Sequence, residues 1–178
     1  DFIDVSVNPT NKEEIAVSTY SAFPLSVVNK KEGTCEVYDN LNSPLQLSLA
    51  GNGWALASDV SYDEKGNLWV LNGLTNRPLS VLDKNDVWHT FDCGVDARNR
   101  YTTKMIVDYN DNIWMATESG GMFGYNYNND LENVSSHKAI QLTVGSFSGD
   151  LPTSNVTALA VDFDNEIWIG TDAGFAVL

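Results

Sequence analysis

The sequence predicts an all-β protein made of repeated four-stranded units, and three observations lead to that prediction. One short pattern occurs three times: an Asp, a turn rich in Asn, Asp or Gly, and a Trp six residues after the Asp. Apolar, β-branched or aromatic residues flank each turn, as in half-buried strands. The Trp residues lie 45 and 54 residues apart, and this period with several strands per repeat is typical of β-propeller blades. The Asp–Trp pairs are Asp63–Trp69, Asp108–Trp114 and Asp162–Trp168.

Each copy is interpreted as a β-hairpin, because tolerant turn residues stand between two apolar segments. Helical repeats of similar length are disfavoured. Apolar positions alternate or run in short blocks instead of recurring every three or four residues. Gly, Asn and Asp also interrupt the chain too often for long helices.

The first predicted blade, residues 1–40, is a degenerate copy of the others. Its hairpin turn is two residues longer than in the other copies, and Glu14–Thr19 aligns with Glu166–Thr171. This alignment places Ala16 at the position of the repeated Trp. Its four strands are expected at residues 2–7, 14–19, 23–29 and 35–39.

Three further blades follow after connections rich in Gly, Pro or Arg. We expect them at residues 57–92, 104–143 and 156–178, with connections at 41–56, 92–103 and 144–155. The fourth reaches only its third strand, at residues 175–178. The prediction is a single propeller domain or fragment over residues 1–178, with about four consecutive four-stranded blades and the last one incomplete. Such a partial propeller is about half of a six- to eight-bladed ring.

Composition limits the possible partners. The 178 residues are 43% apolar, enough for a packed core, and contain no apolar run that could span a membrane. The net charge is −14, with only ten Lys and Arg, which excludes direct nucleic-acid binding. The acidity is explained by solubility and by protection of strand edges. Because the sequence opens at Asp1 without Met or signal segment, we expect a removed signal or a piece of a longer chain.

The repeated residues are interpreted as structural. The three Trp side chains pack between blades, since each has a large apolar surface. The three Asp side chains bond the backbone of their own turns. The segment from Asp162 begins like a calcium loop, but Ile167 and Ala173 stand where such a loop needs Gly and Glu. No metal site and no cofactor are therefore expected.

No catalytic residues are predicted either. His89 and His137 fall near the outer strands of their blades, away from carboxylates at a central funnel, where lyase chemistry would need them. Cys35 and Cys93 are expected too far apart for a disulfide and to remain as buried small residues or free thiols.

A candidate ligand-binding face comes from the distribution of arginine. All three Arg fall in loops that open on one face of a propeller: those between second and third strands and those between blades. Aromatic residues share these loops, and an Arg fork matches carboxylate or phosphate groups. The alternative is a chance distribution with local ion pairs to nearby Asp. The candidate residues are Arg77, Arg98, Arg100, Trp54, Tyr101 and Tyr20.

The segment 151–174 resembles the two-component-regulator propeller repeat. It carries a Leu-Pro lead, Val156-Thr-Ala-Leu159, Asp162, and Glu166-Ile-Trp-Ile-Gly-Thr171 with Gly174. Residues 105–121 carry the pattern well. Residues 60–69 carry it only up to Trp69, because Leu71-Asn72-Gly73 replaces the expected Gly-Thr.

The resemblance implies an extracytoplasmic protein, in the periplasm or on the outer cell surface, of the kind found in Bacteroidetes. It implies a non-enzymatic binding or scaffold module similar to PorZ-like surface propellers of type IX secretion, with an anionic glycan or lipopolysaccharide as ligand. Two alternatives stay open: the periplasmic ligand-sensing domain of a hybrid two-component regulator, and a propeller lyase or hydrolase. Exposed blade flanks would be covered by other blades of a longer parent chain or by self-association.

Overall fold

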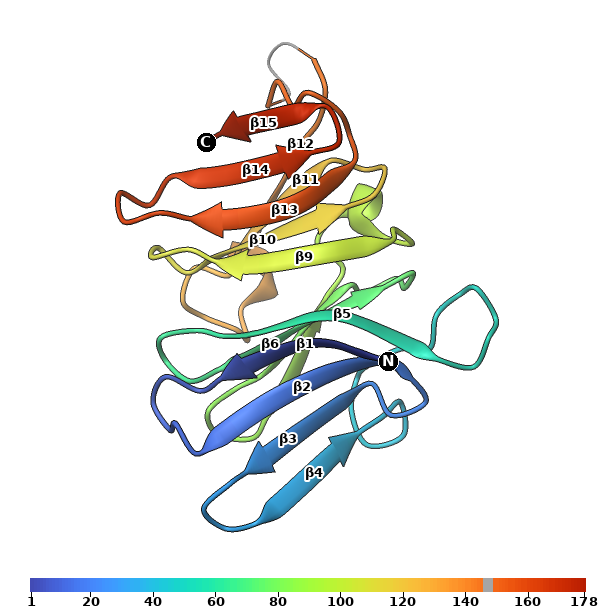
Figure 1. The fold of residues 1–178 in the computed structure, drawn as a ribbon, viewed down its shortest axis with the longest axis vertical. Helices are drawn as coiled ribbons and strands as arrows, with labels where there is room; N and C mark the ends of the chain where they lie inside the picture. Colours follow the sequence, from blue (N-terminus) through green and yellow to red (C-terminus); the bar gives the residue numbers. More distant parts are fainter. Residues whose placement is uncertain (146–148) are drawn as a thin grey trace. The chain divides into compact units, whose positions relative to one another are not determined.

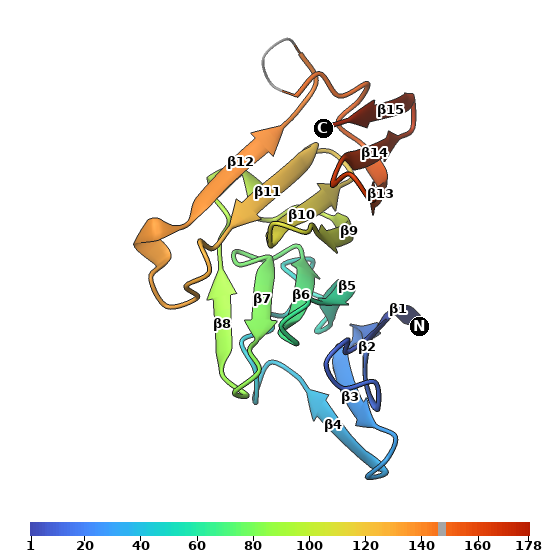
Figure 2. The ribbon, with the colours of Figure 1, turned by 90° about the vertical axis from the view of Figure 1, so that its left-hand side faces the viewer.

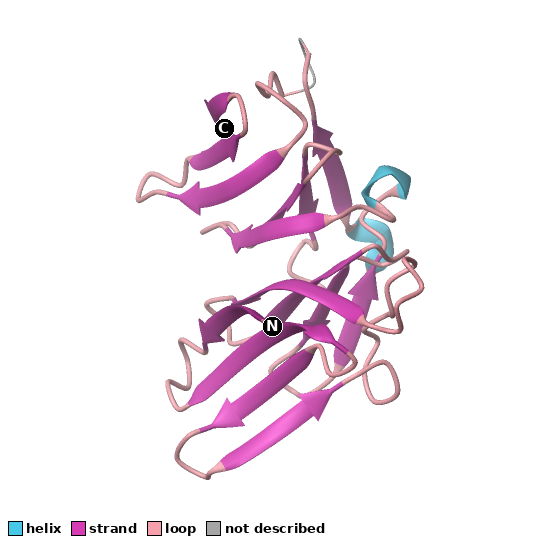
Figure 3. Ribbon diagram, turned by 45° about the vertical axis from the view of Figure 1, so that its right-hand side comes forward, coloured by secondary structure: helices cyan, strands magenta, loops and turns pink. Residues whose placement is uncertain are grey.

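The computed structural model describes residues 1–145 and 149–178, and these residues form an all-β protein (Figure 1). Fifteen strands and two three-residue 3₁₀ turns, η1 (Val95–Ala97) and η2 (Val134–Ser136), make up the regular structure of the described residues (Figure 3). None of their helices has the length and apolarity needed to cross a membrane. Residues 146–148, in the predicted connection 144–155, lie outside the described residues. The predicted all-β class is confirmed.

The chain divides into two compact units, residues 1–92 and 93–178. In unit 1, two groups of four antiparallel strands share one sheet, with the order β4-β3-β2-β5-β6-β7-β8 and β1 on β2. The link is short: Tyr20 pairs with Leu56 and Ser21 with Ala55, because β2 runs two residues past the predicted end. The strands are β1 (Phe2–Val7), β2 (Glu14–Ser21), β3 (Leu25–Asn29), β4 (Thr34–Tyr38), β5 (Ala55–Tyr62), β6 (Leu68–Gly73), β7 (Leu79–Leu82) and β8 (Trp88–Phe91).

Unit 2 contains two separate sheets (Figure 2). The first has four strands in the order β12-β11-β10-β9, and the second has three in the order β13-β14-β15. Their bounds are β9 (Thr102–Val107), β10 (Asn112–Thr117), β11 (Met122–Asn126), β12 (Lys138–Leu142), β13 (Val156–Val161), β14 (Ile167–Thr171) and β15 (Gly174–Val177). The succession of four-stranded groups with a three-stranded last group confirms a partial propeller. Its description as one domain stays a prediction.

Strand register places the repeated Trp residues at equivalent positions. Trp69 pairs with Ser61, Trp114 with Ile106 and Trp168 with Ala160, each partner lying eight residues earlier. In the first group Ala16 pairs with Ser6, ten residues earlier. The difference of two residues is the longer turn predicted for that copy.

Each unit has an apolar core between its two strand groups. In unit 1, Ala16 and Leu25 of the first group pack with Val60, Leu68 and Val70 of the second. In unit 2, Trp114 and Met122 pack with Val156, Ile167 and Ile169. Both cores therefore hold neighbouring blades face to face, as sheets in a propeller do.

Candidate functional site

The repeated Asp and Trp are bonded directly to each other, an arrangement that we call the Asp–Trp clip. In the first copy, Asp63 Oδ1 accepts the backbone N–H groups of Lys65 and Asn67 at 3.0 and 2.9 Å. Its Oδ2 accepts Asn67 Nδ2 at 2.8 Å and Trp69 Nε1 at 3.0 Å. Both Asp63 and Trp69 are buried. One carboxylate thus satisfies the turn backbone and the indole of the following strand.

The second clip repeats these contacts. Asp108 accepts the backbone N–H groups of Asn110 and Asn112 at 2.8 and 2.9 Å. It also accepts Asn112 Nδ2 at 2.8 Å and Trp114 Nε1 at 2.9 Å. The clip therefore belongs to the repeat and not to one hairpin.

The third clip is exposed. Asp162 accepts the backbone N–H groups of Asp164 and Glu166 at 3.0 Å and Trp168 Nε1 at 2.9 Å. The Trp168 indole N–H, followed by the Glu166 backbone N–H, lowers the pKa of Asp162. The Trp168 side chain is 42% exposed and stacks on Phe175, whereas Trp69 is 0% exposed. Packing burial thus varies among the copies while the polar contact stays.

Sequence reasoning assigned the Asp residues to their turns and the Trp residues to packing, and missed the bond between them. The available signal was the constant six-residue spacing. In a tight hairpin this spacing brings the turn Asp beside the second residue of the next strand.

The first hairpin replaces both partners of the clip. Asn8 stands at the Asp position and Ala16 at the Trp position. Asn8 Nδ2 donates to Glu14 Oε1 at 2.9 Å, and Tyr62 Oη of β5 donates to the same oxygen at 2.8 Å. Polar satisfaction here depends on a side chain from the neighbouring strand group.

Beside this hairpin lies a groove of about 340 Å³, which we call the acidic groove. One side comes from β2–β4 and the other from β5 to the β7–β8 turn. Its carboxylates are Glu14, Glu32, Glu36, Asp83 and Asp86. Two tyrosines donate into it, because Tyr38 Oη bonds Glu36 Oε2 at 2.6 Å and Tyr62 bonds Glu14. The groove therefore has hydrogen-bonded phenols among anionic oxygens.

Burial, followed by the hydrogen bond to a glutamate, raises the pKa of both Tyr38 and Tyr62 far above the ordinary value. We expect two of the seven tyrosines to stay protonated when the remaining ones ionise near pH 10. Because the folded state holds these protons more tightly than the unfolded chain, stability is full below pH ~10 and falls as the pH rises further. Phenolate absorbance at 295 nm measures the number titrated. The variant Tyr62→Phe removes one late-titrating group. Uniform ionisation of all seven in the folded protein would contradict this prediction.

Unit 2 has a groove at the equivalent register, with different chemistry. We call it the Gly124 groove; it measures about 440 Å³. Glu14 pairs with Asn29 and Asn29 with Thr34, and the equivalent pairs are Asn112 with Asn126 and Asn126 with Lys138. Glu36 likewise corresponds to Ile140, and Val27 to Gly124. The acidic lining of unit 1 is therefore a property of its own residues and not of the repeat.

The candidate ligand residues of unit 1 lie at the opposite end of the strands from the hairpin turns. Tyr20 is near the end of β2, Trp54 precedes β5, and Arg77 is in the β6–β7 loop. The pairing of Tyr20 with Leu56 and of Leu56 with Gly73 brings these three chain segments to one sheet end. Trp54 is 50% exposed, and Tyr20 is partly buried.

Arg98, Arg100 and Tyr101 occupy the connection before β9 in unit 2. Arg100 Nε donates to Asp96 O at 3.0 Å, and Tyr101 O accepts the Glu118 N–H at 3.0 Å. Tyr101 is 52% exposed. No carboxylate of the described residues forms an ion pair with Arg77 or Arg100. The structure thus gathers the candidates as one cluster in each unit.

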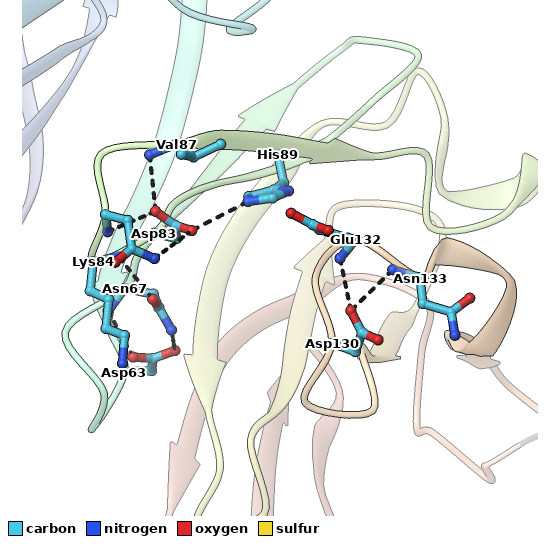
Figure 4. A network of polar contacts seen from close by, with 10 residues as sticks. Asp63, Asn67, Asp83, Lys84, Val87, His89, Asp130, Glu132 and Asn133 are labelled. Carbon is cyan, nitrogen blue, oxygen red and sulfur yellow. Dashed lines mark hydrogen bonds and ion pairs between the residues drawn. The ribbon is translucent and has the colours of Figure 1, made fainter.

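The two histidines have local partners. His89 Nε2 lies 3.5 Å from Asp83 Oδ2, in the network drawn in Figure 4. Burial opposes ionisation of Asp83, but the N–H groups of Val87 and Asn85 outweigh it and lower its pKa. His137 Nδ1 is 2.7 Å from Tyr125 Oη, and its Nε2 is 2.7 Å from Asp130 O.

Other sequence-level candidates are placed as follows. Cys35 is exposed and Cys93 is buried, and both are free thiols. Within the described residues, no three side chains of His, Cys, Asp or Glu are grouped so as to hold a metal ion.

Comparison with known proteins supports the fold. The structure aligns with PorZ, an essential bacterial surface component of the type-IX secretion system of Porphyromonas gingivalis, with a TM-score of 0.82 and 23% identity. It aligns with the Dos1 propeller at 0.71 and 15%, and with a streptogramin B lyase at 0.65 and 10%. These alignments cover 100%, 100% and 99% of this chain, but only 25%, 46% and 53% of those chains. At such identities the likeness shows the fold alone.

The family comparison concerns the last blade. Comparison with curated protein sequences gives no significant match. Residues 150–173, which run from the connection after β12 through β14, match the family model of the two component regulator propeller. This segment includes the third Asp–Trp clip, and the resemblance predicted from the sequence is confirmed. The chain therefore carries a repeat of the two component regulator propeller family within a partial β-propeller.

Proposed function

We propose that this chain is a non-enzymatic, extracytoplasmic binding or scaffold module that recognises an anionic glycan or lipopolysaccharide headgroup through its arginine loops. The observation that carries the proposal is the pairing of exposed aromatic rings with Arg side chains in loops at one sheet end. Tyr101 adjoins Arg100, and Trp54 shares its sheet end with Arg77. Aromatic faces suit sugar rings, and Arg forks suit carboxylate or phosphate groups.

Net charge strengthens the case for local recognition. At −14 the whole chain repels polyanions, so binding of an anionic glycan must come from a local concentration of cationic groups. The likeness in fold to PorZ, described as a bacterial surface component, supports the extracytoplasmic setting and a role in surface assembly.

The test is the triple replacement of Arg77, Arg98 and Arg100 by Ala. We expect at least a tenfold loss of affinity for an anionic ligand, equivalent to about 1.4 kcal/mol. Calorimetry would use polygalacturonate and purified lipopolysaccharide separately, with neutral dextran as the uncharged reference. The two anionic probes distinguish a glycan carboxylate from a lipid-borne phosphate.

The matched control replaces three exposed lysines, Lys12, Lys30 and Lys31, by Ala. It removes the same charge from hairpin turns at the other end of the strands, so its affinity should stay within about twofold. Equal losses in both variants would reduce the effect to net charge. Unchanged binding by the Arg variant would remove the proposed site.

A ligand-sensing domain of a hybrid two-component regulator is the second candidate, and the match over residues 150–173 favours it. The gene sequence after Leu178 separates the two functions. A membrane span and a kinase would support a sensor, whereas a second propeller and a β-sandwich without a span would support a secretion component.

A further inference from the structure

The Gly124 groove has one wall, whereas the acidic groove has two. The far wall of the acidic groove includes Leu82 at the end of β7 together with Asp83, Lys84 and Asp86 of the β7–β8 turn. All residues that line the Gly124 groove fall between positions 112 and 140, on or beside β10–β12. The turn that covers the groove in unit 1 therefore has no counterpart over the Gly124 groove.

The strand that would precede such a turn is present. Trp69 pairs with Val81 of β7, and Trp168 pairs with Val177 of β15, so β7 and β15 occupy equivalent places. Continuing this register, Leu82 corresponds to Leu178. Strand β7 pairs with β8 along its far side, while β15 is the last strand in the order β13-β14-β15.

The far side of β15 presents a regular set of backbone groups. Ile167 and Leu178 exchange both backbone hydrogen bonds, at 2.9 and 3.0 Å. Because bonded pairs alternate along an antiparallel ladder, Phe175 and Val177 direct their N–H and C=O groups away from β14. Their equivalents in β7, Leu79 and Val81, pair with Phe91 and His89 of β8.

We infer that the edge of β15 and the Gly124 groove together form an acceptor site for one antiparallel strand, entered from β15 through a tight turn as β8 is entered from β7. In this register a residue equivalent to Trp88 stands opposite Leu178 and faces the β9–β12 sheet. In unit 1, Trp88 contacts Tyr38 edge-on, with ring centroids 5.4 Å apart. The occupant thus needs a large apolar side chain at that position.

The lining of the groove specifies the occupant further. Gly124 leaves space where Val27 stands in unit 1, since a Cβ there would lie 2.6 Å from the Trp114 ring. Ile140 is 50% exposed, where unit 1 has Glu36. Lys138 replaces Thr34 and favours a turn that carries carboxylates, as Asp83 and Asp86 do in the β7–β8 turn. We therefore assign an acidic turn followed by an aromatic, alternating strand.

The chain supplies its own test sequence. Since Leu178 corresponds to Leu82, appending a copy of residues 83–92 directly after Leu178 continues the chain in the register of β7–β8. We expect a rise of several degrees in the thermal unfolding midpoint, measured by calorimetry. Hydrogen exchange at Phe175 and Val177, and along the appended strand, should slow by at least about tenfold.

Two variants of the extended chain isolate the two parts of the site. Val177→Pro removes one outward N–H but keeps the bonds of Leu178 to β14, so it should abolish protection of the appended strand while β14 stays protected. Replacing the appended copy of Trp88 by Ser should remove most of the thermal gain without unfolding the chain. Ser at that position tests the groove, and Pro at position 177 tests the edge.

Two results would overturn the inference. One is an appended segment that exchanges at the rate of an unfolded peptide and leaves the unfolding midpoint unchanged. The other is dimerisation of the unextended chain in sedimentation, with slow exchange at Phe175 and Val177, which would assign the edge to a second copy. Neither result depends on ligand binding by the arginine loops.

Discussion

Replacing Asp63 with Ala is expected to lower the free energy of unfolding by roughly 3–5 kcal/mol. The substitution leaves two buried side-chain donors, Trp69 Nε1 and Asn67 Nδ2, without their acceptor. Each unsatisfied buried donor costs about 1–3 kcal/mol, and two turn N–H groups lose their partner as well. Urea unfolding followed by the fluorescence of the buried indole measures the loss.

The chain contains its own control for this prediction. Asp162→Ala removes the same type of contact to Trp168, but this indole is 42% exposed and water can replace the carboxylate. Its loss of stability should be clearly smaller than that of Asp63→Ala, and Asp108→Ala should resemble Asp63→Ala. Equal losses at all three positions would show that the turn backbone, and not the buried indole, determines the effect.

Gly121→Ala should be still more damaging, with a loss of more than about 4 kcal/mol or failure to fold. An added Cβ would lie 2.0 Å from the carbonyl oxygen of Leu142, at a backbone φ of +76°. The backbone cannot move aside easily, because Gly121 donates to Ser154 O at 2.9 Å and accepts from Thr117 N at 3.1 Å. Circular dichroism and thermal unfolding of the purified variant measure the effect.

Gly33→Ala separates the collision from the backbone conformation. Gly33 has a φ of +68° and no atom within 4 Å of an added Cβ, so only the left-handed conformation is penalised, by about 1–2 kcal/mol. A similar loss at both glycines would mean that Leu142 yields to the new methyl group.

The architecture followed from local signals that are read along the chain. The Asp-to-Trp spacing, the turn residues and the alternating flanks specify hairpins. A repeat of such hairpins leaves few arrangements besides a propeller. The extra two residues in the first turn were visible for the same reason, since Glu14–Thr19 aligned with Glu166–Thr171 only after a gap.

The sharing of one sheet by β2 and β5 was not visible in the sequence. It depends on Tyr20 and Ser21 continuing β2 beyond Thr19, where propensity gives no boundary. The acidic groove was missed because its carboxylates come from five separate segments. Glu14, Glu36 and Asp83 meet only through strand register, which no single stretch of sequence displays. The arginine loops could be assigned to one sheet end from topology alone, but their ligand is a matter for measurement.

The substituted first hairpin has a consequence for the order in which the protein completes its structure. The three clipped hairpins satisfy their turn carboxylates with donors four to six residues away, so each can finish locally as soon as it forms. Glu14 instead receives its second donor from Tyr62, 48 residues later. Contacts over such separations form late, because the loop between them must close first. During synthesis, the hairpin that emerges first from the ribosome is therefore the one that must wait longest for its last hydrogen bond.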